Sequence, residues 1–345
     1  MKTNKIIILI IISIAFTSCF SENYMIITKV ERDGSFRREI KTVADSLSIS
    51  LFPYNLTDGW EISQTDTILK EWSDKDKYKK NIKISKKFKS IEELSADFRH
   101  DLIFPSPNES LKKRFRWFYT YYAFTAIYPE ITDKGRVPMD NYLNREEQKF
   151  YLQGDISTYR GMTGFELKTN ILDGLETSFM KWYSRSMYEE SFEIILQYVN
   201  ADLRSQLFAI KDSLYSINIK QVDYFKDPSI SDICIILDKF FVTDHYSRLY
   251  YENGQEMNNI LEGRTKVVDE LQKFSIQYEL ALPGKLIATN ADLQNDGSLV
   301  WKINMFKFLA DDYMLTAESR VVNIWAFALT ILLIAFSVAC FKKLI

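Results

Sequence analysis

Few side chains in this sequence are spaced as an enzyme active site would require. Asp238, His245 and Arg248 follow one another by seven and three residues, so a helix over 231–251 would place them on one face. A carboxylate beside an imidazole can act as a general acid–base pair, which makes Asp238 and His245 the candidate catalytic residues. The ordinary alternative is a solvated helix face, on which Asp244 and Arg248 form an ion pair at i and i+4.

Other catalytic patterns are weaker still. Ser110 and Lys113, in "SLKK", have the spacing of a Ser-x-x-Lys nucleophile, but they stand in a charged stretch typical of a solvated strand or helix. The sequence contains no G-x-S-x-G or H-E-x-x-H motif. With two histidines and three cysteines, a histidine-rich zinc centre is hard to build, so we predict no metal and no other cofactor. A non-enzymatic protein is favoured over a hydrolase or transferase with an unrecognised site.

The N-terminal end has the features of an export signal. Two lysines precede Ile6–Phe16, an apolar run of 11 residues, which suits a signal peptide and is too short to span a bilayer. "FTSC" follows, and this order resembles a bacterial lipoprotein signal. The resemblance predicts residues 1–18 as the signal peptide and Cys19 as the lipid-bearing first residue of the mature chain. Phe16 departs from the Leu usual in that motif. An uncleaved signal anchor and an ordinary signal peptide are the alternatives.

The C-terminal end predicts a membrane helix. Ile324–Phe341 holds 18 residues without a charge, which at 1.5 Å per residue extend about 27 Å. We predict a transmembrane helix over 321–341 and a cytoplasmic tail over 342–345, because cationic residues favour the cytoplasmic side. A buried helix of a globular protein is the alternative. The flanking residues that suit a membrane interface are Trp325, Lys342 and Lys343.

Together the two ends predict an inner-membrane protein whose main domain, 19–320, lies on the extracytoplasmic, periplasmic side. The net charge of −2 gives no reason to expect a nucleic-acid partner. Apart from Cys19, which is predicted to carry lipid, Cys234 is the only cysteine of this predicted domain, so we expect no internal disulfide and a small buried apolar residue at 234. The expected partners are the bilayer itself, anionic lipid and other envelope proteins.

The hydrophobic pattern of the domain changes from strand to helix and back. Met25–Val30 and Phe36–Val43 flank an Asp-Gly turn, and the phrase "DGSFRREI" returns as "DGSLVWKI" at 296–303. A helical section is expected over 144–271 and a β section over 273–320, where alternate residues of "FSIQYELALP" are apolar. The order predicts an α+β fold, in which the N- and C-terminal hairpins pair into an antiparallel sheet.

Individual elements within these sections can be predicted from caps and breakers. Asn144 and Glu147 form a capping box, as do Ser90 and Glu93. Apolar residues spaced by three and four predict helices over about 170–199 and then over 203–217. Two further helices are expected, and their ranges are 231–251, ending near Gly254, and 257–271.

Two surfaces are candidates for binding. The stretch 70–90 carries nine lysines against three acids and is a candidate for contact with anionic head groups, with a solvated basic face as the alternative. The aromatic run 115–128 is expected to form a strand buried on both faces, with a glycan-stacking platform as the alternative. The lysines proposed for the anionic surface are Lys79, Lys80, Lys83, Lys86 and Lys87.

The stretch "LPGKLIATNADLQNDGSLVWKINMFKFLADDYMLTAESRVVN", followed by a single span, resembles membrane-tethered bacterial lipoproteins with an LppM-like β module. The whole layout is similar to uncharacterised envelope lipoproteins of Bacteroidetes. The resemblance implies location and fold, and carries over no catalytic residue. The sequence therefore predicts a membrane-anchored periplasmic lipoprotein that acts as a scaffold or interaction protein. A lipid-binding envelope module and an envelope hydrolase or transferase are the alternatives.

Overall fold

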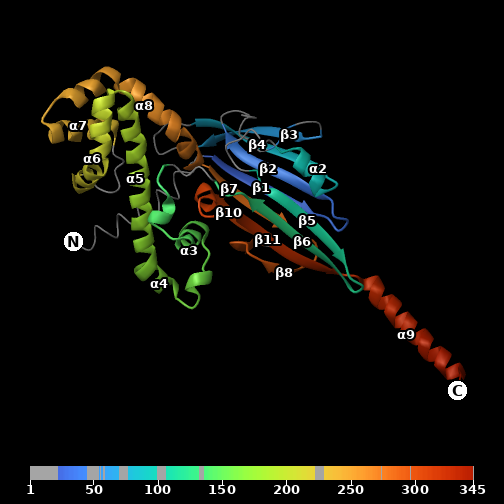
Figure 1. Ribbon diagram of the computed structural model, residues 1–345. Coiled ribbons are helices and arrows are strands. Elements are labelled where there is room, and N and C mark those ends of the chain that lie inside the picture. The colour runs from blue at the N-terminus through green and yellow to red at the C-terminus, as the bar shows by residue number, and fades with distance from the viewer. Residues whose placement is uncertain are drawn as a thin grey trace. The chain divides into compact units, whose positions relative to one another are not determined.

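The computed structural model describes residues 22–44, 54, 56, 59–69, 77–98, 106–131, 136–221, 229–272, 274–295 and 297–344. The chain divides into two compact units. The sheet unit comprises Met1–Pro129, Gln272–Met305 and Asp312–Ile345, and the helical unit comprises Glu130–Leu271 and Phe306–Asp311. The α+β prediction is confirmed (Figure 1). Cys19 and the predicted signal peptide lie outside the described residues.

The first sheet of the sheet unit is seven-stranded and mixed. The predicted hairpin is present, and its turn uses Gly34 at a φ of 98°, a conformation that favours glycine. β1 also pairs with β7 in parallel, Ile26 lying opposite Tyr278, so the terminal β sections do not meet as an antiparallel pair. A parallel pair needs a long connection, which the residues between the two strands supply. In order the strands are β3 (Glu61–Leu69), β4 (Lys77–Phe88), β2 (Phe36–Ala44), β1 (Glu22–Val30), β7 (Phe274–Ala281), β10 (Ser298–Asn304) and β9 (Leu293–Asn295).

A second, four-stranded sheet is antiparallel throughout. It faces the first sheet, since the rings of Phe124 and Tyr278 lie 5.9 Å apart across the interior. The aromatic strand begins at Tyr119 instead of 115, and only its even-numbered residues are buried, so the expectation of burial on both faces is wrong. The strand pairs on both edges but has one half-buried face. In order the strands are β5 (Asn108–Phe115), β6 (Tyr119–Tyr128), β11 (Tyr313–Val322) and β8 (Lys285–Thr289).

A short helix and a capping motif connect these strands. α2 (Ile91–Ala96) buries Leu94 completely, as the local apolar pattern requires. The capping box predicted at Ser90 does not form, because the Ser90 side chain makes no cap hydrogen bond. Instead the Glu93 carboxylate accepts from the backbone N–H of Lys89 at 2.7 Å.

The helical unit follows the predicted order with local differences. The capping box of Asn144 and Glu147 is confirmed, and Gly154 ends that segment in the left-handed region. The chain also forms π-helical turns at Lys149–Gln153 and Leu167–Leu172 and 3₁₀ turns at Met139–Asn141 and Ser157–Tyr159. A further 3₁₀ turn, Met305–Phe308, lies between β10 and β11. The α-helices are α3 (Arg145–Gln148), α4 (Gly164–Glu166), α5 (Asp173–Gln197), α6 (Ala201–Gln221), α7 (Ile230–Phe241) and α8 (His245–Gln272).

The helix predicted over 231–251 is in fact two helices. α7 ends at Phe241, Val242 adopts a left-handed φ of 54°, and α8 begins at His245. α8 then continues through Gly254, where a stop was expected. Glycine weakens a helix interior but does not end it when tertiary packing holds the helix on both sides.

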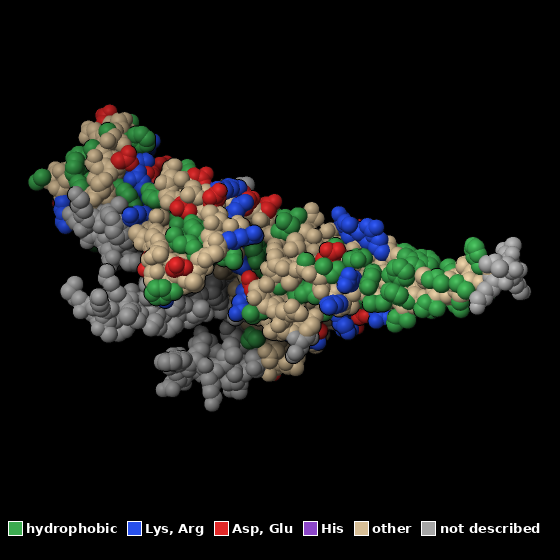
Figure 2. All heavy atoms as spheres, turned by 90° about the horizontal axis from the view of Figure 1, so that it is seen from below, with side chains coloured by type: hydrophobic (Ala, Val, Ile, Leu, Met, Phe, Trp, Pro, Cys, Tyr) green, Lys and Arg blue, Asp and Glu red, His purple; other side chains and the backbone are tan. Residues whose placement is uncertain are grey.

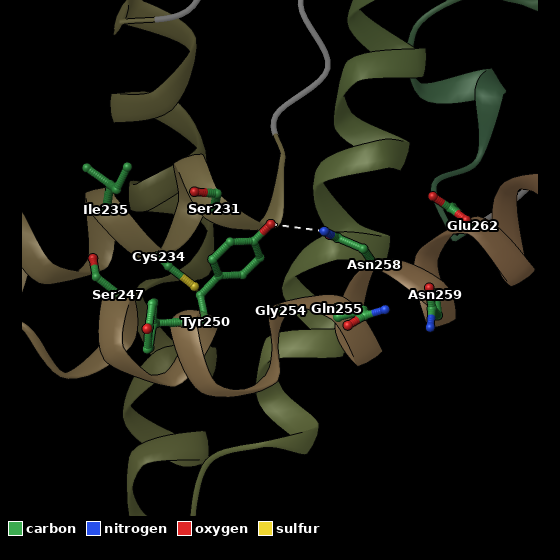
Figure 3. Close-up of a pocket in the computed structure, with 11 residues that line it drawn as sticks. Ser231, Cys234, Ile235, Ser247, Tyr250, Gly254, Gln255, Asn258, Asn259 and Glu262 are labelled. Carbon is green, nitrogen blue, oxygen red and sulfur yellow. Dashed lines mark hydrogen bonds between the residues drawn. The ribbon is translucent and has the colours of Figure 1, made fainter.

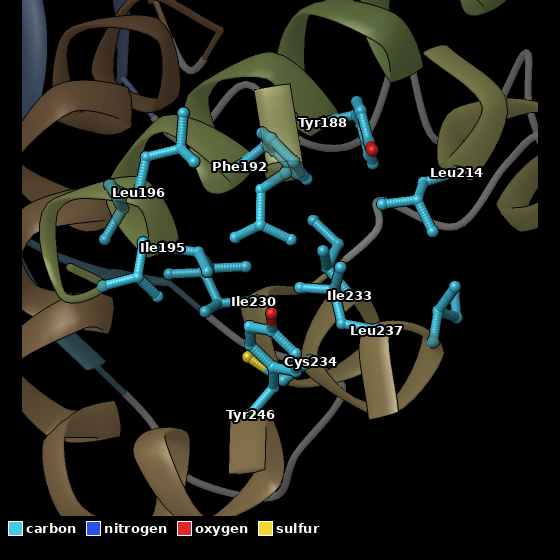
Figure 4. Packing of buried hydrophobic residues seen from close by; sticks show 14 of the residues in the cluster. Tyr188, Phe192, Ile195, Leu196, Leu214, Ile230, Ile233, Cys234, Leu237 and Tyr246 are labelled. Carbon is cyan, nitrogen blue, oxygen red and sulfur yellow. The ribbon is translucent and has the colours of Figure 1, made fainter. Parts of the chain in front are cut away.

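Apolar side chains from α5, α6, α7 and α8 form the main core of the helical unit (Figure 4). Leu207 and Leu214 of the predicted α6 stripe are buried in it. Cys234 is buried there as expected, and burial raises the pKa of its thiol to about 12, which removes it as a nucleophile. A second cluster packs α5 against the first turns of the unit, Phe179 and Trp182 being its central aromatic residues.

Candidate membrane interface

α9 (Ile324–Leu344) extends away from the strands of the sheet unit (Figure 1). Its segment Ile324–Phe341 is, among the described residues, the one helix long and apolar enough to cross a membrane by length and composition. Only 6% of this window is buried. Figure 2 shows hydrophobic side chains covering the helix, with Lys and Arg side chains gathered where it meets the sheet unit. A soluble protein would not expose so large an apolar surface without a partner.

The helix is joined to the sheet through one residue. β11 ends at Val322 and α9 begins at Ile324, so Asn323 alone connects them. The Asn323 backbone N–H donates to the carbonyl of Phe118 at 2.9 Å, and its amide nitrogen donates to the carbonyls of Arg116 at 2.9 Å and Trp117 at 3.2 Å. Its amide oxygen accepts from the Thr120 hydroxyl at 3.0 Å. These bonds fix the base of α9 to the β5–β6 turn.

Aromatic rings from that turn surround the first turns of α9. Trp325 stacks on Phe115 with a centroid distance of 6.1 Å and meets Trp117 edge-on at 5.5 Å. The Trp117 indole N–H donates to the hydroxyl of Thr330 at 2.9 Å. We call this set the aromatic collar, and its members are Phe115, Trp117, Phe118, Tyr119, Trp325 and Phe327.

Basic side chains lie beside the aromatic collar. Lys112, Arg114 and Arg116 are exposed on β5 and its turn. The Arg320 guanidinium lies 4.7 Å from the ring centre of Tyr119, a cation–π contact at the end of β11. Aromatic rings and cations at the end of an apolar helix are the composition expected at the head-group level of a bilayer.

The structure describes the side chain of only one of the three residues predicted for the membrane interface. Trp325 lies in the aromatic collar. Lys342 and Lys343 belong to the last turn of α9, but their side chains lie outside the described part of the chain. The aromatic run predicted from sequence contributes Phe115 and Trp117 through its turn and not as a flat stacking platform.

The lysines proposed for an anionic surface do not share one face of β4. Lys86 is largely buried, pairs with Asp97 at 2.6 Å and lies over the rings of Trp60 and Phe88. Lys83 points to the other face and pairs with Glu39 at 2.6 Å. Successive residues of a strand alternate between faces, so Lys80 lies on the Lys86 side and Lys87 on the Lys83 side. Lys79 is in β4, and its side chain is outside the described part.

The candidate catalytic pair is not assembled. Asp238 belongs to α7 and His245 to α8, so they do not share a helix face. The Asp238 carboxylate is 8% exposed and accepts the backbone N–H groups of Tyr246 and Ser247, both at 2.8 Å. It is therefore a cap for α8, as a carboxylate at a helix N-terminus commonly is. The alternative ion pair of Asp244 and Arg248 is present at 2.6 Å.

A buried charged network in the sheet unit was missed by the sequence reasoning. Arg38 of β2 and Glu109 of β5 are fully buried and bind through two bonds, of 2.6 and 3.1 Å, across the two sheets. The Arg38 guanidinium also donates to the hydroxyls of Tyr54 and Tyr278, and Thr28 donates to Tyr278 at 3.0 Å. The alternation of Phe36, Arg38 and Ile40 in "FRREI" was the available signal, since it places Arg38 on the inward face.

This network is electrostatically self-contained. Burial on its own lowers the pKa of Arg38, but the charge of Glu109 and the surrounding oxygens outweigh it and raise that pKa well above the usual value. Burial also raises the pKa of Tyr54 and of Tyr278, so both stay neutral donors and acceptors. Arg38 and Glu109 are both inaccessible to solvent, so the network is a contact between the two sheets and not an exposed site.

Among the described residues, no group of His, Cys, Asp and Glu side chains could hold a metal ion. Comparison with protein-family models, with curated proteins and with solved structures found no match to this chain. The resemblance to envelope lipoproteins with an LppM-like module therefore stays a prediction.

Proposed function

We propose that this chain is a membrane-anchored protein of the cell envelope, which holds its folded units at the bilayer surface as a non-enzymatic scaffold or interaction protein. The observation that carries the proposal is the junction at Asn323, where an exposed apolar helix continues directly from a sheet strand inside a collar of aromatic and basic residues. A helix that was made to be buried in a soluble core would not need such a collar.

The junction implies a stiff anchor. A Gly- or Ser-rich linker would let the sheet unit rotate freely above the bilayer, whereas one hydrogen-bonded Asn leaves no such segment. The sheet unit then keeps a constant orientation to the helix, and Arg114 and Arg116 stay at head-group height. Each cation near an anionic membrane surface contributes about 1 kcal/mol to the attraction.

The proposal about which side of the membrane each part occupies is based on the sequence. We propose that Cys19 carries lipid, that the short tail with Lys342 and Lys343 is cytoplasmic, and that the main domain is periplasmic, at the inner membrane. The two anchors would act on the same bilayer. The Asp238 carboxylate caps α8 and the Arg38–Glu109 network is buried, so neither group supports the enzyme alternative.

A fractionation experiment with four versions of the full-length gene tests the proposal. They are the native chain, Cys19→Ser, a stop codon replacing Ile324, and the two changes combined. After alkaline carbonate extraction, we expect the first three in the membrane pellet and the combined variant in the soluble fraction. Radioactive palmitate should label the native chain and the chain stopped at 324, and neither chain with Cys19→Ser.

The outcomes separate the two anchors. Release of the native chain by carbonate contradicts the membrane proposal as a whole. Release of the variant stopped at 324, while Cys19 is intact and unlabelled, contradicts lipidation but keeps the helix as anchor. Retention of the combined variant with a precursor-sized mass would support the uncleaved signal anchor, and its retention at the mature size would show that neither end is the anchor.

A further inference from the structure

A hollow of about 690 Å³ lies between α7 and α8 in the helical unit (Figure 3). None of its described lining residues belongs to the aromatic collar. This volume is in the range of small-ligand sites. α7 provides Ser231, Cys234 and Ile235, and α8 provides the remaining lining residues. These are Ser247, Tyr250, Tyr251, Gly254, Gln255, Asn258, Asn259 and Glu262.

Gly254 shapes one wall of this hollow. A Cβ atom built at Gly254 would lie 3.0 Å from Cε2 and Cζ of Tyr250, so the ring of Tyr250 occupies the space of the missing side chain. The Tyr250 hydroxyl then accepts from the amide of Asn258 at 3.0 Å, as Figure 3 shows. The missing side chain at Gly254 therefore leaves room for the ring of Tyr250, one turn earlier in the same helix.

The lining groups match a neutral ligand rich in hydroxyls. In the part of the chain that the structure describes, the side chains of Gln255 and Asn259 make no hydrogen bond, and both are exposed. A carboxamide offers two donors and an acceptor, which suits pairs of neighbouring hydroxyls. Ser231 and Ser247 supply two further hydroxyl groups.

The acidic lining residue and an exposed aromatic ring restrict the kind of ligand that the hollow could bind. Glu262 is the single acidic residue of the lining, and no Lys or Arg is among the described lining residues, so a phosphate or carboxylate would find no cation there. Tyr251 is 90% exposed beside the hollow, and its ring offers an apolar face to the C–H face of a sugar. Cys234, with its raised pKa, provides no nucleophile.

We infer that the hollow between α7 and α8 binds a neutral saccharide, held by the amides of Gln255 and Asn259 and packed against Tyr250 and Tyr251. The site is a binding site without a catalytic group. It does not depend on whether α9 spans a membrane, so its test is independent of the proposed anchoring.

The test uses the purified full chain in a zwitterionic detergent, because a glycosidic detergent would compete for the site. Maltotriose, chitotriose and mannotriose are titrated by calorimetry, with glucose 6-phosphate as the charged comparison. We expect at least one trisaccharide to bind with a Kd below about 1 mM. Gln255→Ala should weaken that binding at least tenfold, and Gln206→Ala, an exposed Gln on α6, should leave it unchanged.

A pair of glycine variants tests the wall of the hollow. Gly254→Ala should displace the Tyr250 ring and weaken binding, whereas Gly263→Ala, in the same helix with no atom within 4 Å of the new methyl group, should not. Circular dichroism checks that every variant stays helical. Absence of binding by all three trisaccharides overturns the proposal, and so does equal binding by Gln255→Ala and Gln206→Ala. Preferential binding of glucose 6-phosphate would overturn the assignment of a neutral ligand.

Discussion

The sheet unit and the helical unit differ in where their buried charged side chains lie. In the sheet unit Arg38 and Glu109 lie at the centre of the interior, fully removed from solvent. In the helical unit the main core is apolar, and the buried carboxylate of Asp238 lies at a helix start, where backbone N–H groups satisfy it. In both places the charge is held by hydrogen bonds, although Nε of Arg38 is buried without a partner.

The two locations indicate different roles for the Arg38–Glu109 pair and for Asp238. A buried ion pair contributes little net stability compared with apolar residues of the same shape, since desolvation offsets the attraction. We therefore interpret Arg38–Glu109 as a device that selects one alignment of the two sheets, because its two bonds are satisfied in only that alignment. Asp238 acts locally and determines where α8 begins.

Breaking the ion pair on one side is expected to have the largest effect. Glu109→Gln leaves the Arg38 guanidinium buried without its counter-charge, so the free energy of unfolding should fall by about 3–5 kcal/mol. The double variant Arg38→Met, Glu109→Leu should regain most of this loss. Urea unfolding followed by tryptophan fluorescence measures both.

The exposed pair Arg37–Glu61 of the same sheet provides the control for that prediction. Glu61→Gln should lower the unfolding free energy by less than about 1 kcal/mol. If Glu109→Gln proves no more destabilising than Glu61→Gln, the interpretation of the buried network is wrong.

Removal of the junction amide is expected to have the next largest effect. Asn323→Ala removes the acceptor of the buried Thr120 hydroxyl and the side-chain donor to the Trp117 carbonyl, and leaves the Arg116 carbonyl with the backbone N–H of Tyr119 alone. The sheet unit should lose about 1–3 kcal/mol. The ring of Trp325 should also become mobile, which nitrogen-15 relaxation of its indole N–H would detect with all tryptophans in place. Unchanged relaxation would contradict the stiff anchor.

Loss of the helix cap should have a smaller effect. Asp238→Ala removes the acceptor for two backbone N–H groups of α8, and we expect a loss of about 1–2 kcal/mol in the helical unit. Asp244→Ala, which removes only an exposed ion pair, should cost no more than about 0.5 kcal/mol. Hydrogen exchange at Tyr246 and Ser247 reports on the cap directly. Equal exchange in the two variants would show that Asp238 is not the cap.

A half-buried acid in the helical unit should give the smallest effect, and one of opposite sign. Burial raises the pKa of Glu176, and the nearby charge of Asp173 raises it further. An acid whose folded pKa is raised destabilises the fold above its unfolded pKa, and this penalty disappears as the pH falls below that value. Glu176→Gln should therefore stabilise by a few tenths of a kcal/mol at neutral pH and by nothing near pH ~3. A stabilisation that persists at the acid pH would point to packing instead of charge.

Much of the fold followed from local pattern. The first hairpin, the alternating strand β7 and the capping box at Asn144 depend on neighbours in sequence, and all three are present. The break at Val242 was missed because its cause is tertiary: Asp238 accepts from the start of α8 only when that helix turns back on α7. The same break explains why the predicted face of Asp238 and His245 does not exist.

The lysine-rich stretch shows the same limit at a surface. Its composition is basic, but a strand sends alternate residues to opposite faces, and Lys83 and Lys86 meet different acids on those faces. The basic residues beside the aromatic collar come from β5 and β11, which are distant in sequence and become neighbours through β6. This basic surface was not predicted from the sequence, because strand pairing brings together residues that are far apart in the chain.

The sequence by itself determined the α+β class and the apolar helix at Ile324–Phe341, because composition and period over a short window are enough for both. Only the tertiary structure decided that Arg38 meets Glu109, that Asn323 joins α9 to the β5–β6 turn, and that α7 and α8 line an open hollow. Each of these contacts joins residues that are far apart in the sequence. Whether they come together depends on how strands pair or helices pack, which a local sequence pattern does not determine.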